Sequence, residues 1–323
     1  MKKRTKIFLA ALAVVLVVIV SGIVSLYMTV SDPSEIIRYE TTNSAITGKT
    51  LVSAHRSGSG IAPEETMMAF KNCVNSEDFD TDIFEFDLHI TKDNILVLLH
   101  DNTLDRTSDS VEVFGEDDIR PEEKTYEELR TLNMGAKFED EDGNTPYSNL
   151  SGSDVPDDLR IVRLEDVLDY LMSNGDFDYI IEIKNGDELG KKAADELYKI
   201  LKARDLFDDV IFGSFQDEVS HYIDETYPEI LRSSTIKEVL DFYVKALTGA
   251  ESIDVPYVAL QIPYKLACVN LGTADVINFA HKNNLAVQYW TINEDEDIEY
   301  LASLGADCII SDYPDKVSEI LKK

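Results

Sequence analysis

The alternation of short β-branched runs with amphipathic helical stretches is the feature that most constrains how this chain can fold. The runs are Leu51–Ala54, Ile83–Leu88, Tyr179–Ile183, Val210–Phe212, Ile230–Arg232, Tyr257–Ile262, Ala286–Trp290 and Cys308–Ile310. Between most of them, apolar residues recur with helical spacing, as in 164–171. Eight strands alternating with helices over about 270 residues predict an α/β fold of the TIM (β/α)8 barrel type. A doubly wound open sheet is the alternative.

One stretch interrupts this alternation. Residues from about 105 to 158 are acidic and polar, and they are rich in Gly, Pro, Asn and Ser. We interpret them as a small acidic insertion beside the barrel mouth, with one helix near Tyr126–Leu132. The predicted barrel domain then spans residues 51–323 and includes this insertion.

The N-terminus predicts a membrane segment. From Ile7 to Val30, 24 consecutive residues carry no charge, which is long enough for a helix to cross about 30 Å of hydrocarbon. A cleaved signal peptide is the alternative, but its apolar part is usually shorter and ends at a clear cleavage site. Four cations before residue 7 predict a cytoplasmic tip. We therefore expect a single-pass cell-membrane anchor over 1–30, a connector over 31–50 and an extracytoplasmic catalytic domain.

The charge balance excludes one class of partner. The chain has 30 Lys and Arg against 62 Asp and Glu, a formal net charge of −32. Such a surface repels nucleic acid, so we expect no nucleic-acid partner. Three widely spaced cysteines, Cys73, Cys268 and Cys308, fit neither a disulfide framework nor a zinc site, and we expect them to be small core residues.

Catalytic side chains of a TIM barrel lie where its strands end, at the C-terminal face. Applied to the predicted strands, this rule selects one set of polar and aromatic residues. They are His55 and Arg56, Glu85 and Asp87, Glu182 and Lys184, and Trp290.

The carboxylates in this set predict a cation site. Glu85 and Asp87 are two residues apart on a strand, so both project to the same face. Glu182, from a neighbouring strand end, adds a third oxygen ligand. Carboxylate oxygens suit Ca²⁺ or Mg²⁺ better than zinc. The alternative is that these are merely solvated acids in a very acidic protein.

A hairpin is expected to bring His100 to the same place. A two-residue turn at Asp93 and Asn94 would set Asp87 opposite His100 on the antiparallel return strand. A slip of one residue in this register would turn His100 to the other face.

These residue types together indicate phosphodiester cleavage. His55 and His100 titrate near neutral pH and can serve in acid–base catalysis. Arg56 and Lys184 supply the local positive charge that an anionic substrate needs in such an acidic protein. Metal, acid–base groups and phosphate-binding cations in one mouth point to hydrolysis of a small phosphodiester.

Four other polar residues are expected to have ordinary roles. His89 lies nearer the hairpin turn than Asp87, and His221 and His281 fall in helical patterns where we expect them to be exposed. Asn293 precedes a run of acidic residues and is expected to cap a helix.

At these positions the chain resembles the glycerophosphodiester phosphodiesterase family. The matching segments are Ala54–Arg56, Pro63–Thr66, Phe84–Asp87, Thr91–Asp93, Leu99–Thr107, Ile181–Lys184, Gly213–Phe215, Trp290–Asn293, Gly305–Asp307 and Ser311–Pro314. They run in the family's order from about residue 51 to 323, and the ordered set is highly specific although single segments are weak.

The resemblance implies a TIM barrel that hydrolyses glycerophosphodiesters to glycerol phosphate and an alcohol. It implies His55 and His100 as general base and acid in either order, one divalent cation on Glu85, Asp87 and Glu182, phosphate contacts from Arg56 and Lys184, and apolar walls from Phe215 and Trp290. Two alternatives stay open. One is a phospholipase D-like or C-like activity on lysophospholipid, and the other is a non-catalytic barrel that binds a phosphorylated head group.

Two residues depart from the family's usual pattern. Ser57 stands where the family has Gly, and a positive φ there would cost Ser more than Gly. Glu65 stands where the family has Asn, and it either adds negative charge near the mouth or complements a helix N-terminus.

Overall fold

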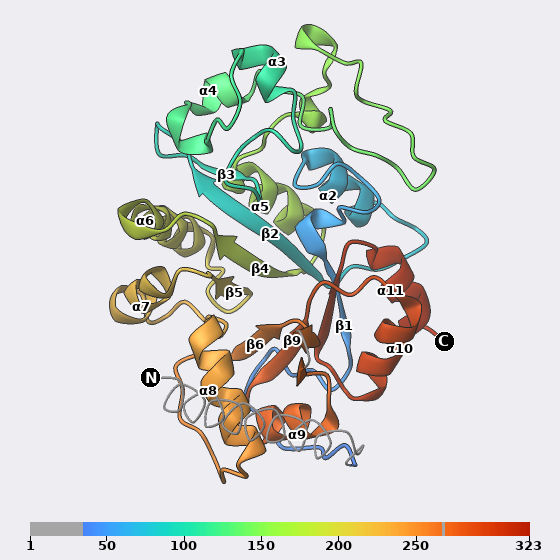
Figure 1. The fold of residues 1–323 in the computed structure, drawn as a ribbon, viewed down its shortest axis with the longest axis vertical. Helices are drawn as coiled ribbons and strands as arrows, with labels where there is room; N and C mark the ends of the chain where they lie inside the picture. The colour runs from blue at the N-terminus through green and yellow to red at the C-terminus, as the bar shows by residue number, and fades with distance from the viewer. Residues whose placement is uncertain (1–34, 267–268) are drawn as a thin grey trace, which may run out of the picture.

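The computed structural model describes residues 35–266 and 269–323. Within them, a sheet of parallel strands runs in the order β5-β4-β2-β1-β10-β9-β6. The strands are β1 (Leu51–Ala54), β2 (Ile83–Ile90), β4 (Asp178–Ile183), β5 (Val210–Gly213), β6 (Ala259–Ile262), β9 (Ala286–Tyr289) and β10 (Cys308–Ser311). Strands distant in sequence, such as β1 and β10, are therefore neighbours, and the sheet curls into a nearly closed, TIM-barrel-like wall (Figure 1).

A short segment bridges the two edges of this sheet. Arg232 pairs with Phe212 of β5, and the next residue, Ser233, pairs with Ala259 of β6. The predicted strand Ile230–Arg232 is therefore not a strand in the structure. Two backbone hydrogen bonds join residues 231–233 to Phe212, and two more join Arg232 and Ser234 to Val258 and Ala259. The segment is thus bonded on both sides, but only one residue pairs with each neighbour.

Helices pack around the outside of the sheet (Figure 1). They are α2 (Met67–Val74), α5 (Leu164–Asn174), α6 (Asp187–Arg204), α7 (Asp217–Thr226), α8 (Ile236–Leu247), α9 (Ala274–Lys282), α10 (Asp295–Ser303) and α11 (Pro314–Leu321). Side-chain alternation along β2 divides the two cores. Phe84 and Phe86 pack in the outer core against helices, whereas Ile83 packs with Ile180 and Ile310 in a small inner core. Glu85 and Asp87 follow Ile83 on its face and so point into the barrel.

The acidic insertion lies between β3 (Leu96–Leu98) and α5. It contains α3 (Ser110–Phe114), α4 (Tyr126–Leu129) and three single-turn helices at Pro121–Glu123, Gly152–Asp154 and Asp157–Leu159. The expected helix near Tyr126–Leu132 is present but ends at Leu129. Leu104, Ile119 and Leu132 are buried in a separate small core beneath it. The insertion is therefore packed onto β3 at one end of the molecule (Figure 1).

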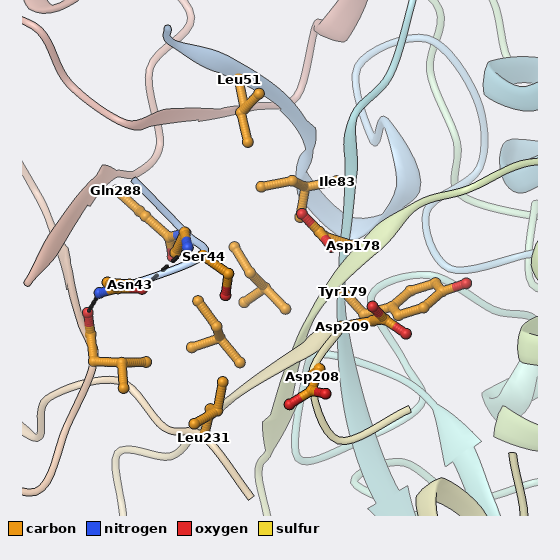
Figure 2. A pocket seen from close by; sticks show the side chains of 14 residues that line it. Asn43, Ser44, Leu51, Ile83, Asp178, Tyr179, Asp208, Asp209, Leu231 and Gln288 are labelled. Atoms are coloured by element: carbon orange, nitrogen blue, oxygen red, sulfur yellow. Dashed lines mark hydrogen bonds between the residues drawn. The ribbon is translucent and has the colours of Figure 1, made fainter. Parts of the chain in front are cut away.

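The residues before β1 pack against the amino ends of the barrel strands. Asn43 donates hydrogen bonds from Nδ2 to the carbonyl oxygens of Val258 and Asn284, at 2.7 and 3.0 Å. It lies at a pocket of about 40 Å³ lined by residues such as Asp178, Asp209 and Gln288 (Figure 2). This closed end is thus covered by Asn43, Ser44 and Ala45, and the open mouth lies at the carboxyl ends of the strands.

Further sequence predictions concern the N-terminus and the three cysteines. The expected membrane segment over 1–30 lies outside the described residues, as does Cys268. In the ranges 35–266 and 269–323, no helix combines the length and apolar character needed to cross a membrane. Cys73 and Cys308 are buried free thiols, as expected of small core residues.

Candidate active site

The carboxyl ends of the strands surround a cavity of about 300 Å³. Its lining includes every site residue selected from the sequence: His55, Arg56, Glu85, Asp87, His100, Glu182, Lys184, Phe215 and Trp290. Ile180 and Ile310 of the inner core lie at its base. Side chains from six separate segments of the chain therefore meet in one place.

His55 is held at the end of β1 by a sharp backbone turn. Residues 55–57 form a single helical turn in which Arg56 has φ 48° and Ser57 has φ 59°. The backbone N–H of Arg56 donates to Glu85 Oε2 at 2.8 Å. His55 Nε2 lies 3.9 Å from the same oxygen, Glu85 Oε2. The turn thus anchors the first histidine to the first carboxylate of β2.

Asp312, which was not among the residues selected from the sequence, orients His55. Its Oδ1 lies 2.6 Å from His55 Nδ1 and accepts from Ser59 Oγ at 2.5 Å, and its Oδ2 accepts from Asn293 Nδ2 at 2.7 Å. Burial alone would lower the pKa of His55, but Glu85 and Asp312 together raise it. Asp312 directly follows the last barrel strand, so the rule that singled out His55 could also have found it.

Asn293 has a different role from the one expected. The residue at the N-cap of α10 is Glu294, not Asn293. Asn293 Oδ1 instead accepts from Ser311 Oγ and from the backbone N–H of Asp312, both at 3.0 Å. Its side chain therefore positions the aspartate that holds His55.

The three carboxylates share the cavity with one lysine. Lys184 Nζ lies 3.1 Å from Asp87 Oδ1 and 2.9 Å from Glu182 Oε1. Burial, with Asp87 nearby, raises the pKa of Glu85 to about 7 and that of Glu182 to about 8. Burial would also raise the pKa of Asp87, but Lys184 and other neighbouring cations lower it overall. Three acids crowded in a buried site need positive charge to ionise together.

The donor chemistry of these residues fits a hard divalent cation. Asp87 is 1% exposed, and its two carboxyl oxygens face the cations Lys184 Nζ and Arg56 Nε, at 3.1 and 3.9 Å, with no further hydrogen-bond donor. Oxygen atoms of this kind are the ligands that Ca²⁺ and Mg²⁺ prefer. In the described residues, no group of three or more His, Cys, Asp or Glu side chains is already arranged as a metal site. Lys184 bridges Asp87 and Glu182 in the arrangement observed.

The hairpin that carries His100 is paired one residue away from the predicted register. Leu88 pairs with Leu98, and the backbone N–H of Leu99 donates to the Asp87 carbonyl oxygen at 3.1 Å. The predicted pairing of Asp87 with His100 is therefore wrong. The turn contains three residues rather than two, with Asn94 in the left-handed region at φ 67°. A single extra turn residue is enough to shift the whole register.

His100 lines the cavity despite this shift. The strand β3 ends at Leu98, so His100 is outside the ladder and its direction is not set by strand alternation. Its Nδ1 lies 2.8 Å from Asp101 Oδ1. Burial, together with the charge of Lys184, lowers the pKa of His100 although Asp87 and Asp101 oppose this. The two cavity histidines thus have pKa values displaced in opposite directions.

A second ion-pair network, also missed from the sequence, connects the two histidine segments. Arg106 donates from Nε to Asp101 Oδ2 and from Nη2 to Glu64 Oε1, both at 2.6 Å. Glu64 also accepts from Arg56 Nη1 at 3.4 Å. The loop that carries His100 is therefore tied to the one that carries Arg56.

The two departures from the family pattern touch each other. Ser57 has a positive φ, the backbone conformation that costs Ser more than the Gly usual at this position. Its Oγ accepts a hydrogen bond from the backbone N–H of Glu65 at 3.1 Å. Glu65 Oε1 in turn accepts from the backbone N–H of Asp87 at 2.6 Å, while Oε2 is buried without a hydrogen-bond partner. Burial raises the pKa of Glu65 well above its usual value. Glu65 is therefore a buried support of Asp87 and not an exposed charge at the mouth.

The remaining histidines are not at the cavity. His221 is exposed, as expected. His281 is not exposed as expected: its Nε2 lies 2.8 Å from Asp307 Oδ2. His89 is fully buried, and burial lowers its pKa to about 4, so it is neutral at ordinary pH.

Aromatic side chains form one side of the cavity. The rings of Phe215 and Trp290 meet edge to face, with centroids 6.0 Å apart. Lys184 Nζ lies 5.8 Å from the Phe215 centroid. The cavity therefore has a charged side and an apolar side.

Comparison with known proteins identifies the family. The model of the glycerophosphoryl diester phosphodiesterase family matches residues 55–316. This chain belongs to that family. The match begins at His55 and includes all the cavity residues named above.

Members of the family include both sequence relatives and solved structures similar to this chain. A glycerophosphodiester phosphodiesterase from Caldanaerobacter subterraneus is 27% identical over 276 residues, covering 85% of this chain and 99% of the relative. A human lysophospholipase D, GDPD3, is 26% identical over 283 residues, covering 81% of each chain. The structure of an Oleispira antarctica phosphodiesterase in complex with the product sn-glycerol-3-phosphate is similar with a TM-score of 0.63, at 22% identity and covering 86% of this chain and 99% of that one.

Proposed function

We propose that this glycerophosphodiester phosphodiesterase uses His55 and His100 as its general base and acid, in either order. A divalent cation, Ca²⁺ or Mg²⁺, is held by Glu85, Asp87 and Glu182. The products are glycerol phosphate and an alcohol. The observation that carries this proposal is the meeting of both histidines and all three carboxylates in one cavity.

The contacts of the cavity residues support separate roles. Arg56 and Lys184 hold the phosphate, because they are cations at the wall of a cavity whose other charged groups are mostly acidic. Asp312 orients His55, and Asp101 orients His100. The bound cation supplies positive charge that stabilises the negative charge of the transition state.

The proton transfers follow from the two histidines. A glycerol hydroxyl of the substrate attacks phosphorus, and one histidine takes its proton. The other histidine donates a proton to the oxygen of the alcohol that leaves. Water then opens the resulting cyclic phosphate with the two roles exchanged, so that each histidine returns to its starting state. The pKa of His55 is raised and that of His100 lowered, which places the two groups in different protonation states over an intermediate pH range.

The test is hydrolysis of glycerophosphocholine by the full chain. We expect activity with Ca²⁺ or Mg²⁺, loss of activity with a chelator, and recovery when the cation is restored. His100→Ala should lower kcat by about 10²–10⁴-fold. The exposed His221→Ala on α7 is the matched control and should leave kcat unchanged.

Two results would contradict this mechanism. Full activity in excess chelator would show that the reaction needs no cation. Full activity of His100→Ala would show that His100 is not one of the two proton carriers. Calorimetric binding of glycerophosphocholine without turnover would favour the non-catalytic barrel that binds a phosphorylated head group.

We also propose that residues 1–30 anchor the protein in the cell membrane and that the catalytic domain, residues 51–323, lies outside the cytoplasm. The uncharged run of 24 residues and the cations before it support this orientation. Protease added to intact cells should then cleave within the connector, residues 31–50, and release the catalytic domain. Protection of the domain until the cells are lysed would contradict the proposed orientation.

A further inference from the structure

The most exposed large hydrophobic side chains gather along one side of the molecule. Six of them are 47–56% exposed, whereas every other one in the ranges 35–266 and 269–323 is 45% exposed or less. The six, which we call the apolar band, are Ile37, Phe215, Ile236, Leu240, Val244 and Leu266. Hydrophobic residues exposed singly need no explanation, but a connected patch of them marks an interaction surface.

The helix α8 connects the band to the catalytic cavity. Ile236, Leu240 and Val244 are spaced four residues apart, so they lie in a row along one face of the helix. The first two also line the catalytic cavity, together with Phe215 and Leu266. The band therefore begins at the cavity mouth and follows α8 away from it for about 18 Å.

The far end of α8 brings the band to the residues before β1. Leu247 lies one turn beyond Val244 and lines a groove of about 440 Å³ together with Ile37. Hydrogen bonds hold the chain there: the backbone N–H of Ile37 donates to Asn278 Oδ1 at 2.8 Å, and Asn278 Nδ2 donates to the carbonyl oxygen of Glu35 at 2.9 Å. Ile37 thus extends the band, and the chain at Glu35 is fixed beside α8 and α9 (Figure 1).

This attachment limits where a membrane anchor can lie relative to the domain. The uncharged run of the sequence ends at Val30, and the chain from Val30 to Glu35 can span at most about 18 Å. A bilayer that holds residues 1–30 must therefore lie close to the far end of α8.

We propose that the apolar band docks on the surface of the bilayer that holds residues 1–30, so that the cavity mouth opens beside the membrane. The proposal rests on the membrane anchor proposed above and goes beyond it, because an anchor alone leaves the domain free to turn. Apolar residues along one face of a helix bury themselves at the boundary between head groups and acyl chains. A row that runs from the anchor to the mouth fixes the orientation of the domain.

The charges beside the band suit a zwitterionic lipid surface. The whole chain has a net charge of −32, but α8 carries two lysines and two acidic residues. At the mouth, Lys265 Nζ lies 4.3 Å from the ring centroid of Tyr264. Lysine stems cover apolar surface while their ammonium groups reach the head groups, and Tyr is enriched at membrane interfaces. The helix that carries the row is therefore neutral overall in a protein that anionic surfaces repel.

The experiment uses the full chain in phosphatidylcholine nanodiscs, with the photo-crosslinking residue benzoylphenylalanine in place of Val244. Val244 belongs to the band but does not line the catalytic cavity. The control carries the same residue in place of Met172 on α5, which is 42% exposed and outside the band. Mass spectrometry after irradiation measures the yield of lipid adducts. We expect a yield several-fold higher at position 244 than at position 172, because docking buries the band among lipids.

A charge placed in the band tests docking itself. Ile37→Asp should lower the adduct yield at position 244 by about fivefold or more, because the bilayer loses an apolar contact and excludes a carboxylate. Leu189→Asp on α6 is the matched control: Leu189 is 41% exposed but outside the band, so the yield should stay unchanged. Neither residue lines the catalytic cavity, so both variants should hydrolyse the water-soluble glycerophosphocholine at the same rate, which shows that they are folded.

The outcomes separate docking from the anchor. Equal adduct yields at positions 244 and 172, in protein that stays with the nanodiscs, would overturn the docking surface and leave the anchor standing. Full chain that elutes free of lipid would overturn both. Adducts between position 244 and a second copy of the chain, instead of lipid, would show that the band is a protein interface and would overturn docking on the membrane. Hydrolysis of glycerophosphocholine in each sample tests the phosphodiesterase independently of these results.

Discussion

The two ends of β10 each carry a histidine–aspartate pair, and only one of these pairs faces the cavity. His55 pairs with Asp312 just after the strand at 2.6 Å, and His281 pairs with Asp307 just before it at 2.8 Å. Both histidine side chains are 13% exposed. In composition, in distance and in the burial of the histidine the two pairs are therefore almost the same, although the Asp312 side chain is 25% exposed and that of Asp307 only 3%.

The difference lies in what surrounds each pair. His55 bonds to Asp312 through Nδ1, and its Nε2 is on the side of Glu85 and the cavity. His281 bonds to Asp307 through Nε2, and the same carboxyl oxygen, Asp307 Oδ2, accepts from the backbone N–H of Val287. The second pair ties α9 to the start of β9 and β10. In TIM barrels, residues at the carboxyl ends of the strands serve catalysis and those at the amino ends serve stability, so a catalytic role is proposed for the His55–Asp312 pair alone.

The acidic residues at the two ends differ in the same way. At the mouth, Asp87 is accompanied by Lys184, which lowers its pKa against the effect of burial. At the opposite end, burial and the neighbouring carboxylates, chiefly Asp209 and Asp176, raise the pKa of Asp178 to about 6 (Figure 2). Acidic clusters thus occur at both ends, but positive charge accompanies the one at the mouth.

The largest expected effect comes from exchanging each histidine for glutamine. His55→Gln should lower kcat for glycerophosphocholine by about 10²–10⁴-fold because it removes a proton carrier. His281→Gln should keep kcat but lower the free energy of unfolding by about 1–2 kcal/mol, since it loses a charge-assisted hydrogen bond. Steady-state kinetics and urea unfolding measure the two effects. Similar losses of kcat in both variants would remove the distinction between the pairs.

Cation binding should distinguish the two acidic clusters. At a Ca²⁺ or Mg²⁺ concentration about 100-fold above Kd, the folded chain should gain about 2.7 kcal/mol, measured as a rise in Tm. Asp87→Asn should abolish this rise, and Asp178→Asn should preserve it. A rise that survives in Asp87→Asn and disappears in Asp178→Asn would place the cation at the wrong end of the barrel for catalysis.

Asp312→Asn should have a smaller effect than loss of His55. Removing this charged hydrogen-bond partner should lower kcat by about 10–100-fold. It should also lower the pKa of His55, because Asp312 helps to raise that value. The limb of the pH–rate profile that reports the titration of His55 should therefore move to lower pH. A shift of the acid limb would identify His55 as the general base, and a shift of the alkaline limb would identify it as the general acid. Asp307→Asn is the control at the other end, and a profile that shifts equally there would refute the positioning role of Asp312.

The smallest expected effect is on stability at the closed end. The folded pKa of Asp178, about 6, exceeds its usual value of 3.8, so the folded state binds more protons between these pH values. The contribution of Asp178 to the stability of the folded chain should therefore fall as pH rises from about 4 to 6 and stay lower above that range. Asp178→Asn should remove this fall and, because the side chain is exposed and screened, raise stability at pH 7 by about 1 kcal/mol or less. Thermal unfolding against pH measures this, with Asp208→Asn at the same pocket as the control, and an unchanged pH dependence in Asp178→Asn would contradict it.

Much of the site could be predicted from the sequence because it follows local rules. Glu85 and Asp87 share a face since strand side chains alternate, and His55 is selected because it follows a predicted strand. His100 was predicted to reach the cavity through a register that is wrong by one residue, and it lines the cavity because the chain leaves the ladder after Leu98. The correct residue was thus selected for an incorrect geometric reason.

The partners of these residues could not be predicted in the same way. Asn293 was expected to cap a helix because its sequence neighbours are acidic, but its hydrogen bonds go to the end of β10. His281 was expected to be exposed because it falls in a helical pattern, but it pairs with Asp307, 26 residues away. The segment Ile230–Arg232 has the composition of a strand, but in the structure a single residue pairs with β5 and the next one with β6, which is too little pairing for a strand.

By itself, the sequence determined most of the order of strands and helices, the position of the cavity side chains at strand ends and the family to which the chain belongs. These depend on periodicity and on short segments, which a linear chain records directly. Tertiary structure alone decided that Asp312 orients His55 and that Glu65 supports Asp87. Each of these is a contact between segments far apart in the chain, and such contacts exist only once closure of the barrel has brought the strand ends together.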